Sequence, residues 1–155
     1  MIPLNREIAG LLPGLRRYAH ALTGNRMSGD RYVRITLETL AEEPWRIRAG
    51  RDVRFHLYKL FNDVLSIFAP DSDDDTIDQA DPYHRLKHRV LDLPLTSRKL
   101  LLLVTVERFP LHRAAELLDM PTLEAEAYLA DARDRLCSLV AEGAARVRIS
   151  QEQAA

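Results

Sequence analysis

Cysteine and glycine are scarce in this sequence of 155 residues, which contains one cysteine, Cys137, and six glycines. A single cysteine excludes an intramolecular disulfide and favours a reducing compartment, so we expect a cytoplasmic protein with Cys137 as a small core residue. The glycines are scattered singly, which excludes a P-loop and a dinucleotide-binding glycine motif. Neither a nucleophile motif nor a metal-ligand cluster is found. We therefore expect no enzymatic activity, no cofactor and no metal.

Long apolar segments and an excess of positive charge are missing as well. The longest uninterrupted apolar run, residues 100–104, is far shorter than the roughly 20 residues that a membrane-spanning helix needs. The N-terminus lacks a basic segment followed by an apolar one, so no secretion signal is visible. The formal net charge of −1 provides no general positive field for nucleic acid. We expect neither membrane attachment nor a general attraction to DNA.

The abundant residue types favour an all-α fold. Hydrophobic residues make up 46% of the chain and aromatic residues only 6%, in a sequence rich in Leu, Ala, Arg and Glu. Apolar residues recur at helical spacing over residues 8–22, 32–40 and 53–68. We expect Pro13 to split the first of these helices, because an interior proline costs about 3 kcal/mol, and Gly24 to end it.

The starts of the later helices are predicted from side chains that can accept backbone N–H groups. We expect Ser28 and Asp52 to cap the second and third helices, and Thr96 and Thr122 to cap two helices nearer the C-terminus. Pro44 should lie just beyond the end of the second helix.

An acidic segment divides the chain. Residues 71–81 contain six aspartates and almost no apolar side chain, so they cannot bury enough surface to fold by themselves. We predict a helical unit over residues 1–70, an acidic linker over 71–81, a second helical unit over 82–145 and a C-terminal tail over 146–155.

The second unit has the pattern of a helix-turn-helix. Ala114 and Ala115 allow a short helix to cross its neighbour closely, and Asp119 suits a tight turn because aspartate tolerates the left-handed conformation. In the longer helix that follows, the residues predicted to face inward are Leu123, Ala125 or Ala127, Leu129, Ala132 and Leu136.

This second unit resembles region four of sigma factors of the extracytoplasmic-function type. The likeness begins at Leu93-Pro94, includes Glu107 and closes with Arg133 and Arg135-Leu136. Residues 15–40 resemble region two, the part of such factors that contacts core polymerase and melts the promoter. Together the two stretches imply a sigma-like architecture of two helical units.

The residues that would read DNA are not basic. Glu126, Tyr128 and Asp131 lie where the resemblance implies positive side chains. Between His112 and Leu136, three arginines are outnumbered by six acidic residues, which leaves a net charge of −3. Because contacts to phosphates supply most of the affinity for a duplex, this helix should be repelled by DNA.

A sigma-like chain with an acidic reading helix resembles the sigma-like domain of the PhyR family of general-stress-response regulators. Residues 12–39 and 57–61 carry this closer likeness. The resemblance implies an anti-anti-sigma factor, a sigma mimic that sequesters a NepR-type anti-sigma factor and releases a stress sigma factor. It also implies a receiver domain in a full-length form, and whether such a domain was removed or never existed stays open.

Candidate partner-binding residues follow from this resemblance, because an anti-sigma factor is expected to bind as amphipathic helices in apolar grooves. One apolar stripe on the third predicted helix has no evident cover within its unit, and further apolar and acidic residues surround the helix-turn-helix. The nine candidates are Phe55, Tyr58, Leu65, Phe109, Leu111, Glu124, Glu126, Tyr128 and Asp131.

The alternative is a functional extracytoplasmic-function-type sigma factor that binds promoter DNA and core RNA polymerase. Residues 44–59 favour it, because they contain five basic residues and only one acidic residue, Asp52. The stretch also contains Trp45, and basic and aromatic side chains together suit a contact to single-stranded DNA. The acidic helix-turn-helix argues against it. We expect the basic stretch to face solvent or an acidic partner.

Overall fold

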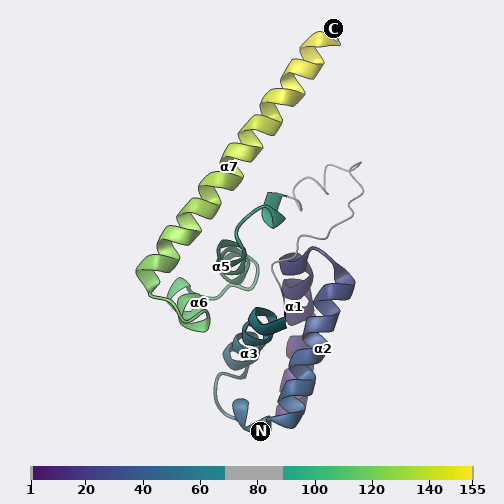
Figure 1. The fold of residues 1–155 in the computed structure, drawn as a ribbon, viewed down its shortest axis with the longest axis vertical. Coiled ribbons are helices and arrows are strands. Elements are labelled where there is room, and N and C mark those ends of the chain that lie inside the picture. Colours follow the sequence, from purple (N-terminus) through teal and green to yellow (C-terminus); the bar gives the residue numbers. More distant parts are fainter. Residues whose placement is uncertain (1, 69–88, 155) are drawn as a thin grey trace.

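Helices are the only regular elements in the described part of the chain. The computed structural model describes residues 2–68 and 89–154, and no strand occurs in these two ranges. Figure 1 shows their arrangement. In chain order they are α1 (Leu4–Thr23), α2 (Arg26–Glu42), the short 3-10 helix η1 (Pro44–Arg46), α3 (Val53–Phe68), α5 (Leu95–Thr105), α6 (Leu111–Leu117) and α7 (Thr122–Gln153). The predicted all-α class is confirmed, whereas the predicted linker at 71–81 lies outside the described residues.

Helix α1 continues through Pro13, so the prediction of two separate helices was wrong. Pro13 and Ala9, the residue four positions before it, are both exposed to solvent. The carbonyl of Ala9 that loses its N–H partner can therefore be hydrated. Ile8 before the proline and Leu15 after it are buried in the same core, and this burial on both sides offsets the local cost.

Short-range signals place the ends of the next helices. Gly24 ends α1 in the left-handed conformation with φ 72°, as predicted. Asn25 caps α2 in place of Ser28, because its extended backbone brings its side chain over the N–H groups of the first turn, that of Ser28 included. Asp52 caps α3 as predicted, with Oδ1 accepting the N–H of Phe55 at 3.0 Å.

Three prolines precede the helices of the second unit. Pro94, Pro110 and Pro121 lie at the N-caps of α5, α6 and α7, and none of these helices has a side-chain cap. Their φ angles of −51°, −57° and −61° lie close to the value that the proline ring imposes. The prediction that Thr96 and Thr122 cap helices was wrong, because a proline occupies the N-cap position of each helix and the threonine lies inside the helix.

A tight turn joins α6 to α7. Asp119 has φ 55° in this turn, which confirms that it adopts the left-handed conformation. Ala114 and Ala115 are buried where α6 meets its neighbours. Leu123 was wrongly predicted to face inward, since it lies in the first turn of α7 and is 78% exposed. Among the α7 residues whose burial is described, Ala125, Leu129 and Ala132 are buried.

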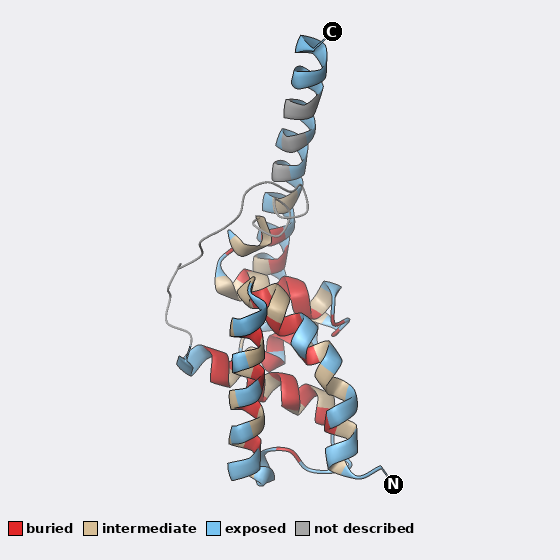
Figure 2. Ribbon diagram, turned by 90° about the vertical axis from the view of Figure 1, so that its right-hand side faces the viewer, coloured by how far each residue is buried: buried red, intermediate tan, exposed pale blue. Residues whose placement is uncertain are grey.

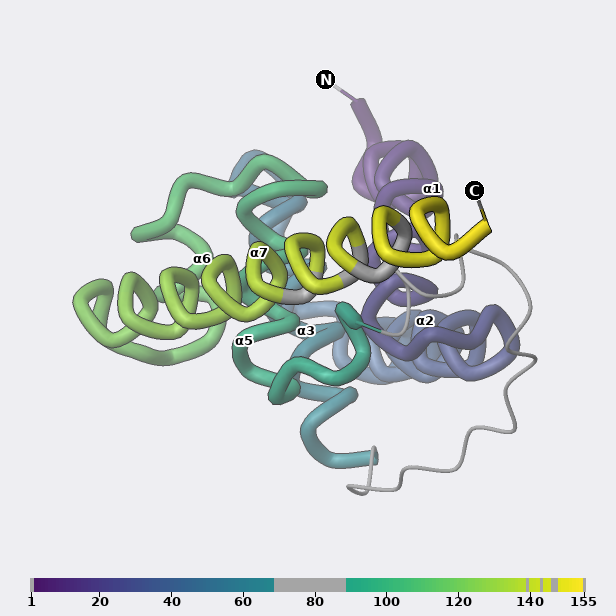
Figure 3. Tube along the Cα trace, turned by 90° about the horizontal axis from the view of Figure 1, so that it is seen from above, coloured from purple at the N-terminus to yellow at the C-terminus, as the bar shows by residue number. Residues whose placement is uncertain are grey.

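Helix α7 is the longest element and extends far beyond the rest of the molecule (Figure 1). It passes over α5, with which it is in contact (Figure 3), and it continues through Gln153 without a break at residue 146. Cys137 is exposed, so the prediction of a core cysteine was wrong; its neighbour Leu136 is the residue that packs against the core. Although α7 is long, no helix in the two described ranges is both long and apolar enough to cross a membrane.

One hydrophobic core joins the two predicted units. Buried residues gather in the middle of the molecule, where the helices of both units meet (Figure 2). The core contains Leu15 and Phe61 from the first unit together with Leu100, Leu103 and Ala114 from the second. Packing across this contact therefore determines how the two units sit relative to each other.

The turn after α5 generates the first prediction. Arg108 has φ 59°, a left-handed conformation that costs a residue with a Cβ atom about 1–2 kcal/mol. We expect Arg108→Gly to raise the free energy of unfolding by about 1 kcal/mol, part of the gain being lost to the entropy of glycine. Urea denaturation measures the change. Arg108→Ala is the control and should give no gain; a less stable glycine variant would contradict the account.

Candidate partner-binding surface

A buried carboxylate lies at the contact between the two units. Glu107, just after α5, is only 3% exposed. Its Oε2 accepts a hydrogen bond from the hydroxyl of Tyr58 at 2.7 Å, and its Oε1 accepts from the guanidinium of Arg17 at 3.1 Å. Arg54 lies 3.6 Å from the carboxylate and donates to the backbone carbonyl of Glu107. Helices α1 and α3 thus both hold one residue of the second unit.

Burial at this contact changes the acidity of two tyrosines. Desolvation raises the pKa of Tyr58 well above its usual value, and the hydrogen bond to the Glu107 carboxylate raises it further. Desolvation also raises the pKa of Tyr18, whose hydroxyl donates to Oδ1 of Asn62 at 3.1 Å. Both phenols therefore stay protonated in the folded protein at pH values where exposed phenols ionise.

Aromatic rings extend the contact around Glu107. The ring centroids of Tyr58 and Phe109 are 5.3 Å apart in an edge-to-face arrangement. The guanidinium of Arg54 lies 4.2 Å from the Phe109 ring, and that of Arg113 lies 3.9 Å from the Phe55 ring. In both cation–π contacts the arginine belongs to one unit and the ring to the other.

This packing corrects the expectation of an uncovered stripe on α3. Phe55, Tyr58 and Leu65 are between 1% and 4% exposed, and Phe109 is 6% exposed. The second unit supplies the missing cover for Phe55 and Tyr58, a long-range contact that spacing within one helix does not reveal. These residues therefore do not form an open surface in this conformation. Leu111 is half-buried against the same core.

Ion pairs close the edges of the contact. Lys59 binds the carboxylate of Asp119 at 2.8 Å, and Arg113 binds that of Asp52 at 2.8 Å. The basic stretch over residues 44–59 is thus partly neutralised, because Arg54 and Lys59 bind groups of the second unit. Arg46 pairs with Glu43 as well, so the expected role of this stretch as a surface for an acidic partner loses three of its five cations.

The remaining candidates lie on α7 and are accessible. Glu124, Glu126 and Asp131 are exposed, and Tyr128 is half-buried against the core. Helical spacing puts Glu124, Tyr128 and Asp131 along one side of α7 and Glu126 on the other. Asp131 also pairs with Arg135 at 2.9 Å. The structure thus separates these exposed α7 residues from the buried candidates on α3.

Sequence reasoning missed the roles of Arg17 and Arg54 as partners of Glu107. Glu107 was noted only as part of the sigma resemblance. A charged residue three positions after the apolar run 100–104 was the available signal, but its burial depends on helices that lie far away in the sequence.

Known proteins share this architecture. The family described as the Sigma2 domain of PhyR matches residues 8–62. The Phyllosphere-induced regulator PhyR of Methylorubrum extorquens is 34% identical over 109 residues, which cover 70% of this chain and 40% of that protein. The NMR structure of the PhyRSL–NepR complex from Sphingomonas sp. Fr1 matches with a TM-score of 0.73 at 32% identity, covering 88% of both chains. The chain belongs to the PhyR family.

This PhyR-family domain also has the fold of a sigma factor. The sigma factor RpoE of Bartonella quintana, solved in complex with the anti-sigma factor NepR, matches with a TM-score of 0.73 over 88% of this chain and 95% of RpoE. The sequence identity is 18%, so this likeness concerns the fold alone. The chain spans 40% of the length of the Methylorubrum regulator.

The buried tyrosines generate a pH prediction. Because folding raises the pKa of Tyr58 above its unfolded value of about 10, the stabilising contribution of this protonated phenol is complete below pH 10 and is lost as the pH rises further. Each such tyrosine should lower the free energy of unfolding by about 1.4 kcal/mol per pH unit above pH 10.

Urea denaturation of the parent protein and Tyr58→Phe tests this, since phenylalanine removes the ionisable group but keeps the ring. The variant should start less stable by about 1 kcal/mol for the lost hydrogen bond. It should then lose stability less steeply above pH 10. Parallel curves for the two proteins between pH 8 and pH 11 would show that the Tyr58 hydroxyl is not shielded.

Proposed function

We propose that this PhyR-family domain is an anti-anti-sigma factor. It mimics a sigma factor, sequesters an anti-sigma factor of the NepR type and so releases a stress sigma factor to RNA polymerase. It acts in the cytoplasm and by binding alone, without catalysis. The observation that carries the proposal is a sigma-factor fold in which the helix expected to read DNA exposes acidic residues.

Electrostatics supports a protein partner over a promoter. Glu124, Glu126 and Asp131 are exposed on α7, so a DNA duplex placed against this helix would meet Glu124 and Asp131 on one side or Glu126 on the other. Specific duplex binding gains its affinity from basic groups that replace counterions on phosphates, and this helix does the opposite. The alternative of a functional sigma factor lacks its main binding surface.

The structural neighbours support the same partner. The sigma-like domain of PhyR from Sphingomonas sp. Fr1 and the sigma factor RpoE from Bartonella quintana were each solved in complex with a NepR protein. Two proteins with this fold, one of them a sigma factor, thus engage an anti-sigma factor of the same name. Competition for one partner is the simplest way for such a mimic to act.

The nine candidate residues divide into two roles under this proposal. The buried Phe55, Tyr58, Leu65 and Phe109 hold the two units in the arrangement that the partner recognises. The accessible residues contact the partner, and these are Leu111, Glu124, Glu126, Tyr128 and Asp131. In a full-length form a receiver domain would control access to this surface.

Binding to the two classes of partner tests the proposal. The full chain is mixed either with the NepR-type anti-sigma factor of the same organism or with a promoter fragment. We expect a stable complex with the anti-sigma factor by gel filtration and no specific binding to the DNA by fluorescence anisotropy. Nanomolar binding to the promoter without a protein complex at low salt would instead support a functional sigma factor.

A further inference from the structure

Hollows lie at two places where the two units meet. One is a groove along α1 with a volume of about 980 Å³, to which α1 contributes Arg16 and Arg17 and the second unit contributes Val90 and Leu102. The other is a smaller cavity of about 210 Å³ between the end of α3, the start of α5 and the turn before α7. The proposed function gives the smaller cavity no role.

A buried amine lines the smaller cavity. Lys99 lies near the start of α5 and is 7% exposed. Its Nζ lies 3.2 Å from Oγ of Ser66, which lines the same cavity and is exposed, so the amine end of the side chain is close to solvent. An ammonium group has three N–H donors. Among the described residues, Nζ has this one hydrogen bond and no ion pair.

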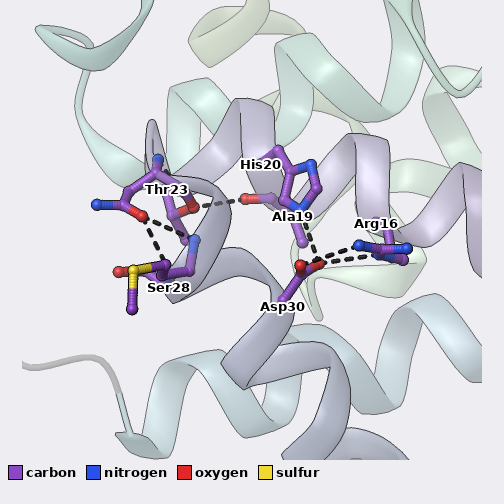
Figure 4. A network of polar contacts seen from close by, with 8 residues as sticks. Arg16, Ala19, His20, Thr23, Ser28 and Asp30 are labelled. Atoms are coloured by element: carbon purple, nitrogen blue, oxygen red, sulfur yellow. Dashed lines mark hydrogen bonds and ion pairs between the residues drawn. The ribbon is translucent and has the colours of Figure 1, made fainter.

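Other charged groups at helix contacts are paired more fully. The carboxylate of Asp30 accepts two hydrogen bonds of 2.9 Å from Arg16 and lies 2.7 Å from Nε2 of His20 (Figure 4). Lys59, at the edge of the contact between the units, binds the carboxylate of Asp119 at 2.8 Å. Lys99 is therefore the less constrained of these two lysines.

Burial makes the Lys99 amine a nucleophile. Desolvation lowers the pKa of Lys99 below its usual value, although the carboxylate of Asp63 opposes this shift. More of this amine is neutral at pH 7 than of an exposed lysine, and only the neutral form has the lone pair that attacks a carbonyl group. Three of the 22 basic side chains are lysines, and the arginines cannot act in this way because they stay protonated.

The acidic residues of the cavity disfavour anions. Asp63 lines it beside Lys99, and Asp119 lines it from the turn before α7. A phosphorylated or carboxylated reagent would meet these side chains on its way to the amine, whereas an uncharged carbonyl compound would not. The volume of about 210 Å³ is below the roughly 300–1,000 Å³ of sites for drug-sized ligands, so the ligand is small.

We propose that this cavity is a modification site, where a small uncharged aldehyde forms an imine with Nζ of Lys99. The lone pair of the neutral amine attacks the carbonyl carbon, and a proton moves from nitrogen to oxygen to give a carbinolamine. The C–O bond then breaks, water leaves with a second proton from nitrogen, and a C=N bond forms. Amine and aldehyde thus give an imine and one water, with no oxidant or reductant. This modification is independent of the anti-anti-sigma function, because it needs only groups of this chain.

Reductive trapping of the folded full chain tests the site. The parent protein is incubated at pH 7 with propanal and sodium cyanoborohydride, which reduces an imine to a stable secondary amine. Peptide mapping by mass spectrometry then measures the adducts at Lys59 and Lys99. We expect labelling about tenfold faster at Lys99, because each pKa unit changes the neutral fraction tenfold. In urea the two rates should be about equal, since unfolding exposes both amines. Labelling of Lys99 no faster than that of Lys59 in the folded chain would show that burial shields the amine and would overturn the proposal.

Two aspartate variants test the neighbouring charge. Asp63→Asn removes the carboxylate that opposes the lowered pKa of Lys99, whereas Asp134→Asn makes the same change at an exposed position of α7 outside the cavity. Thermal melting checks that both variants fold. Propanal should label Lys99 about threefold faster in Asp63→Asn and at the parent rate in Asp134→Asn. An unchanged rate in folded Asp63→Asn would contradict the assignment.

Glyoxylate, an anionic aldehyde, tests the class of ligand. Each aldehyde is compared with its own rate of labelling in urea, so that intrinsic reactivity cancels. In the folded parent protein, glyoxylate should label Lys99 less than propanal does, and Asp63→Asn should narrow this difference. If glyoxylate labels Lys99 as readily as propanal, the cavity accepts anions and the proposal of an uncharged aldehyde is overturned.

Discussion

The buried carboxylate of Glu107 is the interaction on which the arrangement of this protein depends. A carboxylate that is 3% exposed is tolerated only where hydrogen bonds and opposite charges replace the lost water. Tyr58, Arg17 and Arg54 provide these partners, and all three belong to the first unit although Glu107 belongs to the second. If the second unit moved away, Glu107 would lose these three partners and the rings around it would be exposed to water. The shared core and the groove along α1 both rely on that contact.

The body formed by the two units carries two surfaces of opposite charge. The groove beside α1 is rimmed by arginines, and the first part of α7 exposes carboxylates. A protein partner with segments of both signs can match these surfaces together, whereas DNA matches only the first. The sigma-like fold and this charge pattern account for a chain that resembles a transcription factor and is proposed to bind its inhibitor.

Local signals in the sequence predicted the helices and several of their ends. Gly24, Asp52 and Asp119 act where nearest neighbours decide the conformation, and all three behave as expected. The prediction failed where distant parts of the chain decide. Pro13 stays inside α1 because burial on both sides outweighs the lost hydrogen bond, and Phe55 is covered by residues that follow it by more than 50 positions.

The candidate site was predictable to a similar extent. The net negative charge of the first part of α7 can be counted from the sequence, because exposed side chains keep their charge whatever the fold. The α1 residues that line the groove beside this helix are spaced three and four apart in the sequence, but Val90 and Leu102 also line it, and only the tertiary structure brings them to α1. The roles of Arg17 and Arg54 were not predicted either, because their partner Glu107 lies far from them in the sequence.

Displacement of a bound sigma factor tests the central claim most directly. A fluorescently labelled stress sigma factor is first bound to its NepR-type anti-sigma factor, and the full chain is then titrated into the complex. If the chain is a sigma mimic, fluorescence anisotropy should fall to the value of the free sigma factor as the chain takes its place. Unchanged anisotropy at saturating concentrations, or a rise that indicates a ternary complex, would contradict the account.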